Sequence, residues 1–117
     1  MGRWSDWRPL YNAEGENLKP SEIPYEGSGA YMFAASRGRS EKHTLYVGST
    51  KNLKQRLYSH SYGDNIWKSL EKLQDKGYRL WYRVHATSAV WEAQRLEENA
   101  LTEWWCYPLN TLGNPTR

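Results

Sequence analysis

The sequence has few of the residues that cross-link or anchor a chain. Among its 117 residues only Cys106 is a cysteine, which excludes an internal disulfide and a zinc site built from several cysteines. No segment approaches the ~18–20 consecutive apolar residues of a membrane-spanning helix. The N-terminal stretch MGRWSDWRPL also has no apolar core of a secretory signal. We therefore expect a cytoplasmic protein with no membrane partner.

Phenylalanine is scarce as well, with one Phe against seven Trp and nine Tyr. The length suits one hydrophobic core, so we expect a single folded domain at residues 28–110. Residues 1–27 contain three prolines and no sustained periodicity, which predicts an extended N-terminal arm, and residues 111–117 form a C-terminal tail. Trp67 or Trp81, if exposed, could stack on unpaired bases, although such residues more often belong to the core.

Positive charge is concentrated in one part of the chain. Residues 28–60 carry six Lys and Arg but only one acidic residue. A basic stretch with interleaved tyrosines is typical of a surface that binds a polyanion, although an ordinary solvated surface is an equally simple explanation. The candidate nucleic-acid-binding residues are Arg37, Arg39, Lys42, Lys51 and Lys54.

The apolar patterns predict an α+β fold with a small sheet flanked by helices. Alternating residues predict three strands, at 29–34, 43–48 and 78–85. Helical periodicity predicts three helices, at about 49–60, 65–76 and 88–105, the first of them capped by Ser49 or Thr50. The order β-β-α-α-β-α predicts a three-stranded, mainly antiparallel sheet.

A carboxylate interrupts the apolar face of the third predicted helix. That face consists of Val90, Ala93, Ala100, Leu101 and Trp104. Glu97 occupies the position seven residues after the first member, on the same face. A buried carboxylate requires a cation, a hydrogen-bond network or a metal, whereas a residue at the rim of the face would reach water.

The first predicted helix also has polar residues on its apolar face. Arg56 and His60 share a face with Leu53 and Leu57, because the four residues are spaced three or four apart. An arginine fork suits a phosphate, and an imidazole can transfer a proton near neutral pH. The alternatives are an ion pair between Arg56 and Glu97 and a histidine with purely structural contacts.

Two tyrosines lie on the two strands of the predicted hairpin. Gly29 stands two residues before Tyr31, and Gly48 stands two residues after Tyr46. Glycine beside a tyrosine leaves its hydroxyl open to a ligand. The alternative is a pair of ordinary core or cross-strand tyrosines.

These features, in this order, resemble the GIY-YIG nuclease superfamily. The first signature corresponds to the triplet Gly29-Ala30-Tyr31, and the second corresponds to Tyr46-Val47-Gly48. The segment 46–57 is similar to the family's YVG-x-x-x-N-L-x-x-R-L pattern, in which the arginine is catalytic and is matched by Arg56.

Two further segments extend the resemblance over about residues 28–110. Residues 92–99 resemble the family's E-A-x-x-L-E helix, whose second, metal-binding glutamate is matched by Glu97. The triplet Pro108-Leu109-Asn110 resembles the closing P-x-N, whose asparagine supports the site. Three departures are Ala30 in place of Ile, 14 residues between the signature tyrosines, and Ser49 where many members have Lys, for which Lys51 is a candidate replacement.

The resemblance implies a DNA endonuclease that leaves a 5′-phosphate and a 3′-hydroxyl. The implied catalytic residues are Tyr31, Tyr46, Arg56, His60 and Glu97, with Gly29, Gly48 and Asn110 supporting the site. A lone carboxylate ligand suits Mg²⁺, for which Mn²⁺ could substitute. The implied partner is DNA, and a homodimer would let so short a chain cut both strands of a duplex. A restriction-type, phage or mobile-element, or single-strand nuclease would fit.

Two other classes of function remain open from the sequence. The first is a nucleic-acid-binding module that keeps this fold without cutting. The second is a protein-interaction domain whose partner surface is formed by the tryptophans of the arm and of the last helix. Cleavage of plasmid with Mg²⁺ or with EDTA separates the nuclease from both.

Overall fold

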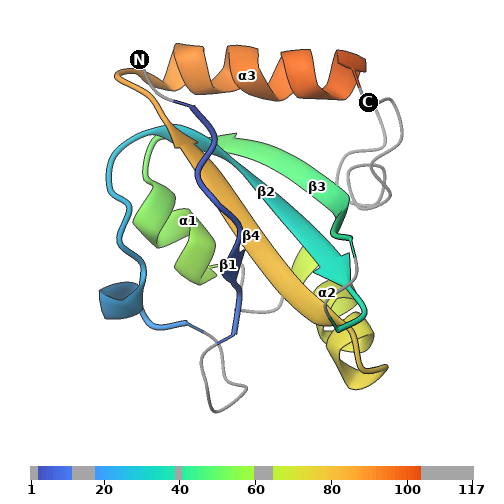
Figure 1. The fold of residues 1–117 in the computed structure, drawn as a ribbon. Helices are drawn as coiled ribbons and strands as arrows, with labels where there is room; N and C mark the ends of the chain where they lie inside the picture. The colour runs from blue at the N-terminus through green and yellow to red at the C-terminus, as the bar shows by residue number, and fades with distance from the viewer. Residues whose placement is uncertain (1–2, 12–17, 39–40, 60–64, 104–117) are drawn as a thin grey trace.

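The computed structural model describes residues 3–11, 18–38, 41–59 and 65–103. In chain order the elements are β1 (Arg8–Pro9), the short 3-10 helix η1 (Pro20–Glu22), β2 (Gly29–Ser36), β3 (His43–Thr50), α1 (Leu53–Ser59), α2 (Asn65–Asp75), β4 (Arg79–Ala86) and α3 (Val90–Glu103) (Figure 1). Within these ranges no helix has the length and apolar character needed to cross a membrane.

The sheet has four strands in the order β1-β4-β2-β3, and all neighbouring pairs are antiparallel. The predicted α+β class is confirmed, but the prediction of a three-stranded sheet is wrong by one strand. The additional strand, β1, has only two residues, which pair with Tyr82 and Trp81 at the edge of β4. So short a segment has no periodicity to detect, and its proline lacks an amide donor, which suits an edge strand.

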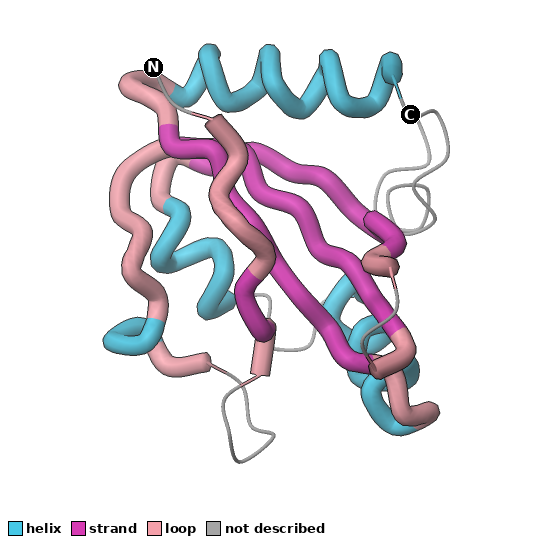
Figure 2. The backbone as a smooth tube through the Cα atoms, viewed as in Figure 1, coloured by secondary structure: helices cyan, strands magenta, loops and turns pink. Residues whose placement is uncertain are grey.

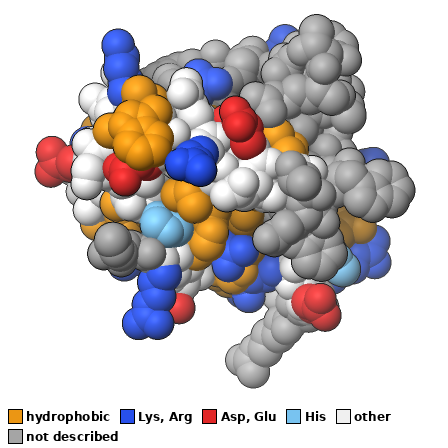
Figure 3. Space-filling model, turned by 90° about the horizontal axis from the view of Figure 1, so that it is seen from above, with side chains coloured by type: hydrophobic (Ala, Val, Ile, Leu, Met, Phe, Trp, Pro, Cys, Tyr) orange, Lys and Arg blue, Asp and Glu red, His pale blue; other side chains and the backbone are white. Residues whose placement is uncertain are grey.

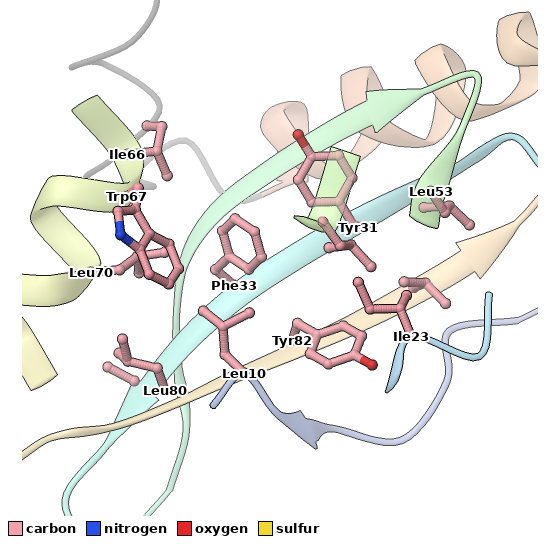
Figure 4. Close-up of a cluster of buried hydrophobic side chains, with 13 residues drawn as sticks. Leu10, Ile23, Tyr31, Phe33, Leu53, Ile66, Trp67, Leu70, Leu80 and Tyr82 are labelled. Atoms are coloured by element: carbon pink, nitrogen blue, oxygen red, sulfur yellow. The ribbon is translucent and has the colours of Figure 1, made fainter. Parts of the chain in front are cut away.

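Helices cover both faces of this sheet, and β2 lies between them with all eight residues buried (Figures 1 and 2). On one face Tyr31 and Phe33 join the larger core with side chains of α1 and α2 (Figure 4). On the other face Met32 and Val47 pack with Ala100 of α3. Because side chains alternate along a strand, neighbouring residues of β2 pack on opposite faces of the sheet.

Gly29 allows α1 to approach the sheet closely. A Cβ atom at this position would lie 2.6 Å from Leu53 Cδ1 and 2.8 Å from the carbonyl oxygen of His85. Both distances are too short for a real contact, so a side chain here would push α1 or β4 away. The glycine therefore fixes the position of the helix that carries Arg56.

The start of α1 differs from the expected one. Asn52 caps this helix, because its Oδ1 accepts a hydrogen bond of 3.1 Å from the Gln55 amide. Ser49 and Thr50, expected as caps, are the last two residues of β3 instead. As a residue of β3, Ser49 points its side chain to the face of the sheet that α3 covers.

The N-terminal residues lie against the sheet rather than away from it. Leu10 is 4% exposed within the larger core. Trp4 and Trp7 pack on the layer that contains α3, and the guanidinium carbon of Arg83 lies 5.2 Å and 4.6 Å from their ring centroids. These contacts place the start of the chain beside β4.

Candidate active site around strand β3

Tyr31 is the most deeply buried member of the candidate site. Its side chain is 1% exposed and lies over Gly48, its partner across the β2–β3 pair. A Cβ atom on Gly48 would lie 2.6 Å from both Cζ and Oη of Tyr31. Glycine at this position therefore makes the space that the tyrosine ring and hydroxyl occupy.

Arg56 meets this tyrosine from α1. Leu53 and Leu57 bury the inner face of the helix, and the Nε of Arg56 donates a hydrogen bond of 3.2 Å to Tyr31 Oη. The guanidinium is thus anchored on one side, while the residue remains exposed to solvent. An anchored arginine at the surface presents a preorganised fork to an anion.

Tyr46 completes a cluster of three aromatic rings on the same face of the sheet. Its ring stacks on Phe33, with centroids 6.0 Å apart and an interplanar angle of 21°. The ring of Tyr31 lies 6.0 Å from that of Tyr46 and 5.5 Å from that of Phe33. Unlike Tyr31, Tyr46 is only partly buried, so its side chain can meet a substrate.

Burial is the main reason that the pKa of Tyr31 and the pKa of Tyr46 both lie above the ordinary value. The hydrogen bond between the two hydroxyls raises the pKa of Tyr31 and lowers that of Tyr46. The charge of Arg56 lowers the pKa of both tyrosines, whereas the charge of Glu97 raises that of Tyr46.

Glu97 approaches from the opposite face of the sheet, on α3. Its Oε1 accepts a hydrogen bond of 2.6 Å from Oγ of Ser49. Ser49 has the same orientation as Val47, two residues earlier in β3, and Val47 packs in the α3 layer. The candidate site therefore surrounds the edge strand β3, with Arg56 and the tyrosines on one side and the carboxylate on the other.

Glu97 fits a divalent metal ion of the Mg²⁺ type. Among the described residues no group of three or more His, Cys, Asp or Glu side chains is placed to hold a metal. Magnesium does not need such a group, because it keeps several waters and binds through one or two carboxylates plus substrate phosphates. A half-buried carboxylate oriented by a serine hydroxyl meets that requirement.

The predicted DNA-binding residues fall into two groups. Lys51 and Lys54 lie at the start of α1, near the candidate site. Arg37 and Lys42 lie at the other end of the β2–β3 hairpin, where they cover the rings of Tyr78 and Trp81 at 4.9 Å and 4.4 Å.

Three predicted residues, Arg39, His60 and Asn110, lie outside the described part of the chain. Of the two tryptophans considered for base stacking, Trp67 is 4% exposed and belongs to the core. Trp81 donates from Nε1 to Ser36 Oγ and lies under Lys42.

The sequence interpretation missed the roles of two residues. Phe33 supports the ring of Tyr46, and its spacing of two from Tyr31 on a strand was the available signal. Ser49 was noted only as a departure from a family lysine, and nothing local links it to Glu97, 48 residues away.

Comparison with known proteins agrees with this arrangement. The family model of the GIY-YIG catalytic domain matches residues 28–104, from the residue before β2 to the residue after α3. The chain belongs to the GIY-YIG family. No curated protein and no solved structure matches it.

Membership in the GIY-YIG family has three general consequences. The domain implies nuclease activity, so its substrate is nucleic acid. GIY-YIG nucleases generally use divalent metal ions. In this member, the two signature triplets lie on β2 and β3, and they are paired directly through Tyr31 and Gly48.

Proposed function

We propose that the protein is a Mg²⁺-dependent DNA endonuclease that hydrolyses phosphodiester bonds to 5′-phosphate and 3′-hydroxyl ends. The observation that carries the proposal is the hydrogen-bonded group of Arg56, Tyr31 and Tyr46 beside the carboxylate of Glu97. These residues combine a phosphate-binding cation, a polarised hydroxyl and a metal ligand around one strand.

Arg56 binds the scissile phosphate in this mechanism. Tyr31 Oη holds the Nε of Arg56, which orients the guanidinium toward solvent. Charge that develops on the nonbridging oxygens is then stabilised by donors that are already in place. Tyr31 itself is too deeply buried to reach a water, so we assign it a positioning role.

Tyr46 orients the attacking water and accepts its proton. This hydroxyl is protonated at neutral pH, because the ordinary pKa of tyrosine is about 10 and burial raises it further. Tyr46 can therefore accept a proton only if it passes its own proton on. Tyr31 and Arg56 assist this transfer because their hydrogen bonds lower the pKa of Tyr46. His60 is the proposed acceptor, and Asn110 is proposed to support the site.

Glu97 would hold the metal ion, with Ser49 fixing the direction of the carboxylate. When bound, Mg²⁺ supplies Lewis-acid stabilisation of the phosphate and the leaving oxygen, and Mn²⁺ could substitute for it. Lys51 and Lys54 would bind phosphates next to the scissile one, and Arg37 and Lys42 would bind more distant phosphates. On duplex DNA, two copies of the chain would each cut one strand.

The test is cleavage of supercoiled plasmid by the wild-type chain with Mg²⁺ and with EDTA. Glu97→Ala is expected to abolish the Mg²⁺-dependent cleavage while DNA binding persists. Glu98→Ala is the matched control, since it removes an exposed carboxylate from the next position of α3. Cleavage by Glu97→Ala at the wild-type rate would overturn the metal assignment. Binding without cleavage by the wild type would instead indicate a non-cutting binding module.

A further inference from the structure

A cavity of about 650 Å³ lies where the end of β4 meets the start of α3. Its lining includes His85 of β4, Ser88, and Trp91, Arg95 and Asn99 of α3. The volume is typical of sites that bind small molecules or single groups of a larger ligand. None of these residues belongs to the catalytic group around β3. Figure 3 shows this side of the molecule, where hydrophobic, basic and acidic side chains lie close together and a histidine side chain lies beside them.

Trp91 is the most exposed large hydrophobic residue among those the structure describes, at 58%. Trp91, Arg95 and Asn99 follow one another at intervals of four, so they form a row along one flank of α3. The row presents an indole ring, a guanidinium plane and an amide in succession. Proteins hold an unpaired base with such groups. An aromatic ring stacks on the base, a cation contacts its phosphate, and an amide forms hydrogen bonds with the edge of the base.

The start of α3 does not offer a phosphate site. Glu92 Oε1 accepts hydrogen bonds of 2.9 Å and 3.0 Å from the backbone amides of Ser88 and Ala89. These amides would otherwise attract an anion, and the carboxylate already occupies that position. The cavity therefore favours a planar, uncharged occupant, and Arg95 remains at its rim for a neighbouring phosphate.

The sheet register relates the cavity to the strand that carries Ser49. His85 pairs with Ala30 on one side, and Ala30 pairs with Ser49 on the other. Two strand spacings therefore separate the Cα atoms of His85 and Ser49, a distance of roughly 10 Å. Successive residues of a helix are about 100° apart, so Glu97 lies on the flank of α3 opposite Arg95. A single strand with one nucleotide in the cavity would therefore need several nucleotides to bring a phosphate to Glu97.

We propose that this cavity binds an unpaired nucleobase of the substrate strand, stacked on Trp91, with Arg95 contacting the adjoining phosphate. The proposal rests on the proposed function, because it takes the substrate to be a nucleic acid. Within a duplex the faces of the bases are already stacked on their neighbours, so the cavity selects single strands, flaps or frayed ends.

The first test compares binding of a single-stranded oligothymidylate with binding of a blunt duplex of equal length, by fluorescence anisotropy in EDTA. Trp91→Ala is expected to weaken single-strand binding about 5- to 100-fold and to leave duplex binding unchanged. Trp91→Phe, which retains a ring, is expected to retain most of the affinity. Gln94→Ala is the control, an exposed position of α3 outside the cavity lining.

Direct contact is tested by ultraviolet cross-linking of the full chain to an oligonucleotide that carries 5-iododeoxyuridine. The cross-link is expected on the peptide that contains Trp91. Equal weakening of both substrates, no weakening of either, or a cross-link only elsewhere would overturn the proposal. So would a wild-type dimer that dissociates on Trp91→Ala, because the cavity would then hold a second copy of the chain.

The two proposals fail in different ways. The binding measurements contain no metal and require no cleavage, so selective single-strand binding would stand even if the wild type cuts nothing. Conversely, plasmid cleavage by the wild type with Mg²⁺ tests the nuclease proposal by itself, and the control Gln94→Ala is expected to cleave at the wild-type rate. Loss of the cavity proposal would therefore leave the nuclease proposal intact.

Discussion

The hydroxyl of Ser49 donates a hydrogen bond of 2.6 Å to Oε1 of Glu97 and so joins the end of β3 to α3. The resemblance to the family implies a lysine at the position of Ser49. In this chain, that position holds the carboxylate in a fixed direction. A carboxylate that is already oriented loses less freedom when it binds a metal ion.

We expect Ser49→Ala to raise the Mg²⁺ concentration required for half-maximal cleavage about 10- to 100-fold, because groups that orient a metal ligand have effects of this size. Plasmid cleavage over a Mg²⁺ titration measures it. Ser49→Thr, which keeps a hydroxyl, is expected to resemble the wild type. An unchanged midpoint in the alanine variant, with the same thermal stability, would show that the hydrogen bond is only structural.

Arg56→Ala is expected to reduce the rate of plasmid cleavage by about 100- to 1000-fold, the effect typical of removing one preorganised donor from a charged transition state. Circular dichroism should show an unchanged fold, because Leu53 and Leu57 bury α1 without the arginine. Arg79→Ala removes an exposed arginine from β4 and serves as the control. Full activity of Arg56→Ala would show that Arg56 has only a structural role, as the hydrogen-bond partner of Tyr31.

Tyr31→Phe keeps the buried ring and removes the oxygen that accepts from Arg56. We expect a smaller loss of cleavage rate than in Arg56→Ala, about 10- to 100-fold, because the lost hydrogen bond has a charged guanidinium as its donor. The pH profile of the rate should also move to higher pH, because the Tyr31 hydrogen bond lowers the pKa of Tyr46. A reduced rate with an unmoved profile would show that Tyr31 positions Arg56 without affecting the pKa of Tyr46.

Gly48→Ala is expected to lower the free energy of unfolding by about 1–3 kcal/mol, the usual cost of overpacking. The added Cβ would lie 2.6 Å from Tyr31 Cζ and Oη, so the ring must move. Urea denaturation measures the change. In the double variant with Tyr31→Ala the clash is absent, so the two effects should not add. If the two changes in the free energy of unfolding simply add, the strain does not arise between position 48 and Tyr31.

Stability should fall in alkaline solution, because burial raises the pKa of Tyr82 to about 12 and the pKa of Tyr31 and of Tyr46 above the ordinary value. An unfolded tyrosine ionises near pH 10, whereas these folded ones stay protonated. The folded state therefore binds more protons above pH 10, and the free energy of unfolding decreases up to the folded pKa. Urea midpoints from pH 8 to 11.5 measure this, and Tyr82→Phe should weaken the dependence. A flat profile would contradict it.

The long elements could be predicted because their patterns are local. The alternation in residues 29–34 and 43–48 corresponds to β2 and β3, and the helical periodicity locates all three helices to within a few residues. The residues of the candidate site were accessible for the same reason. Gly29, Tyr31, Gly48 and Arg56 stand at fixed short spacings in the chain, within one hairpin and the helix that follows it.

The apolar stripe of α3 shows where local periodicity stops being informative. Val90 was expected on the inner face, yet it is 39% exposed, while Ala93 and Ala100 are buried. Periodicity gives the angle between residues around a helix, but the rotation of the helix against the sheet depends on packing with β2 and β3. That rotation leaves Trp91 exposed, whereas Trp67 of α2 is buried.

The sequence by itself determined the α+β class, the nuclease family and the spacing of the signature residues, because each depends on a pattern within a few tens of residues. The tertiary structure decided that β1 joins the sheet, that Ser49 contacts Glu97, and that Trp91 rather than Trp67 is available to a ligand. These features join segments far apart in the chain. They depend on which faces of the sheet and helices meet when the core closes, and no local pattern specifies that choice.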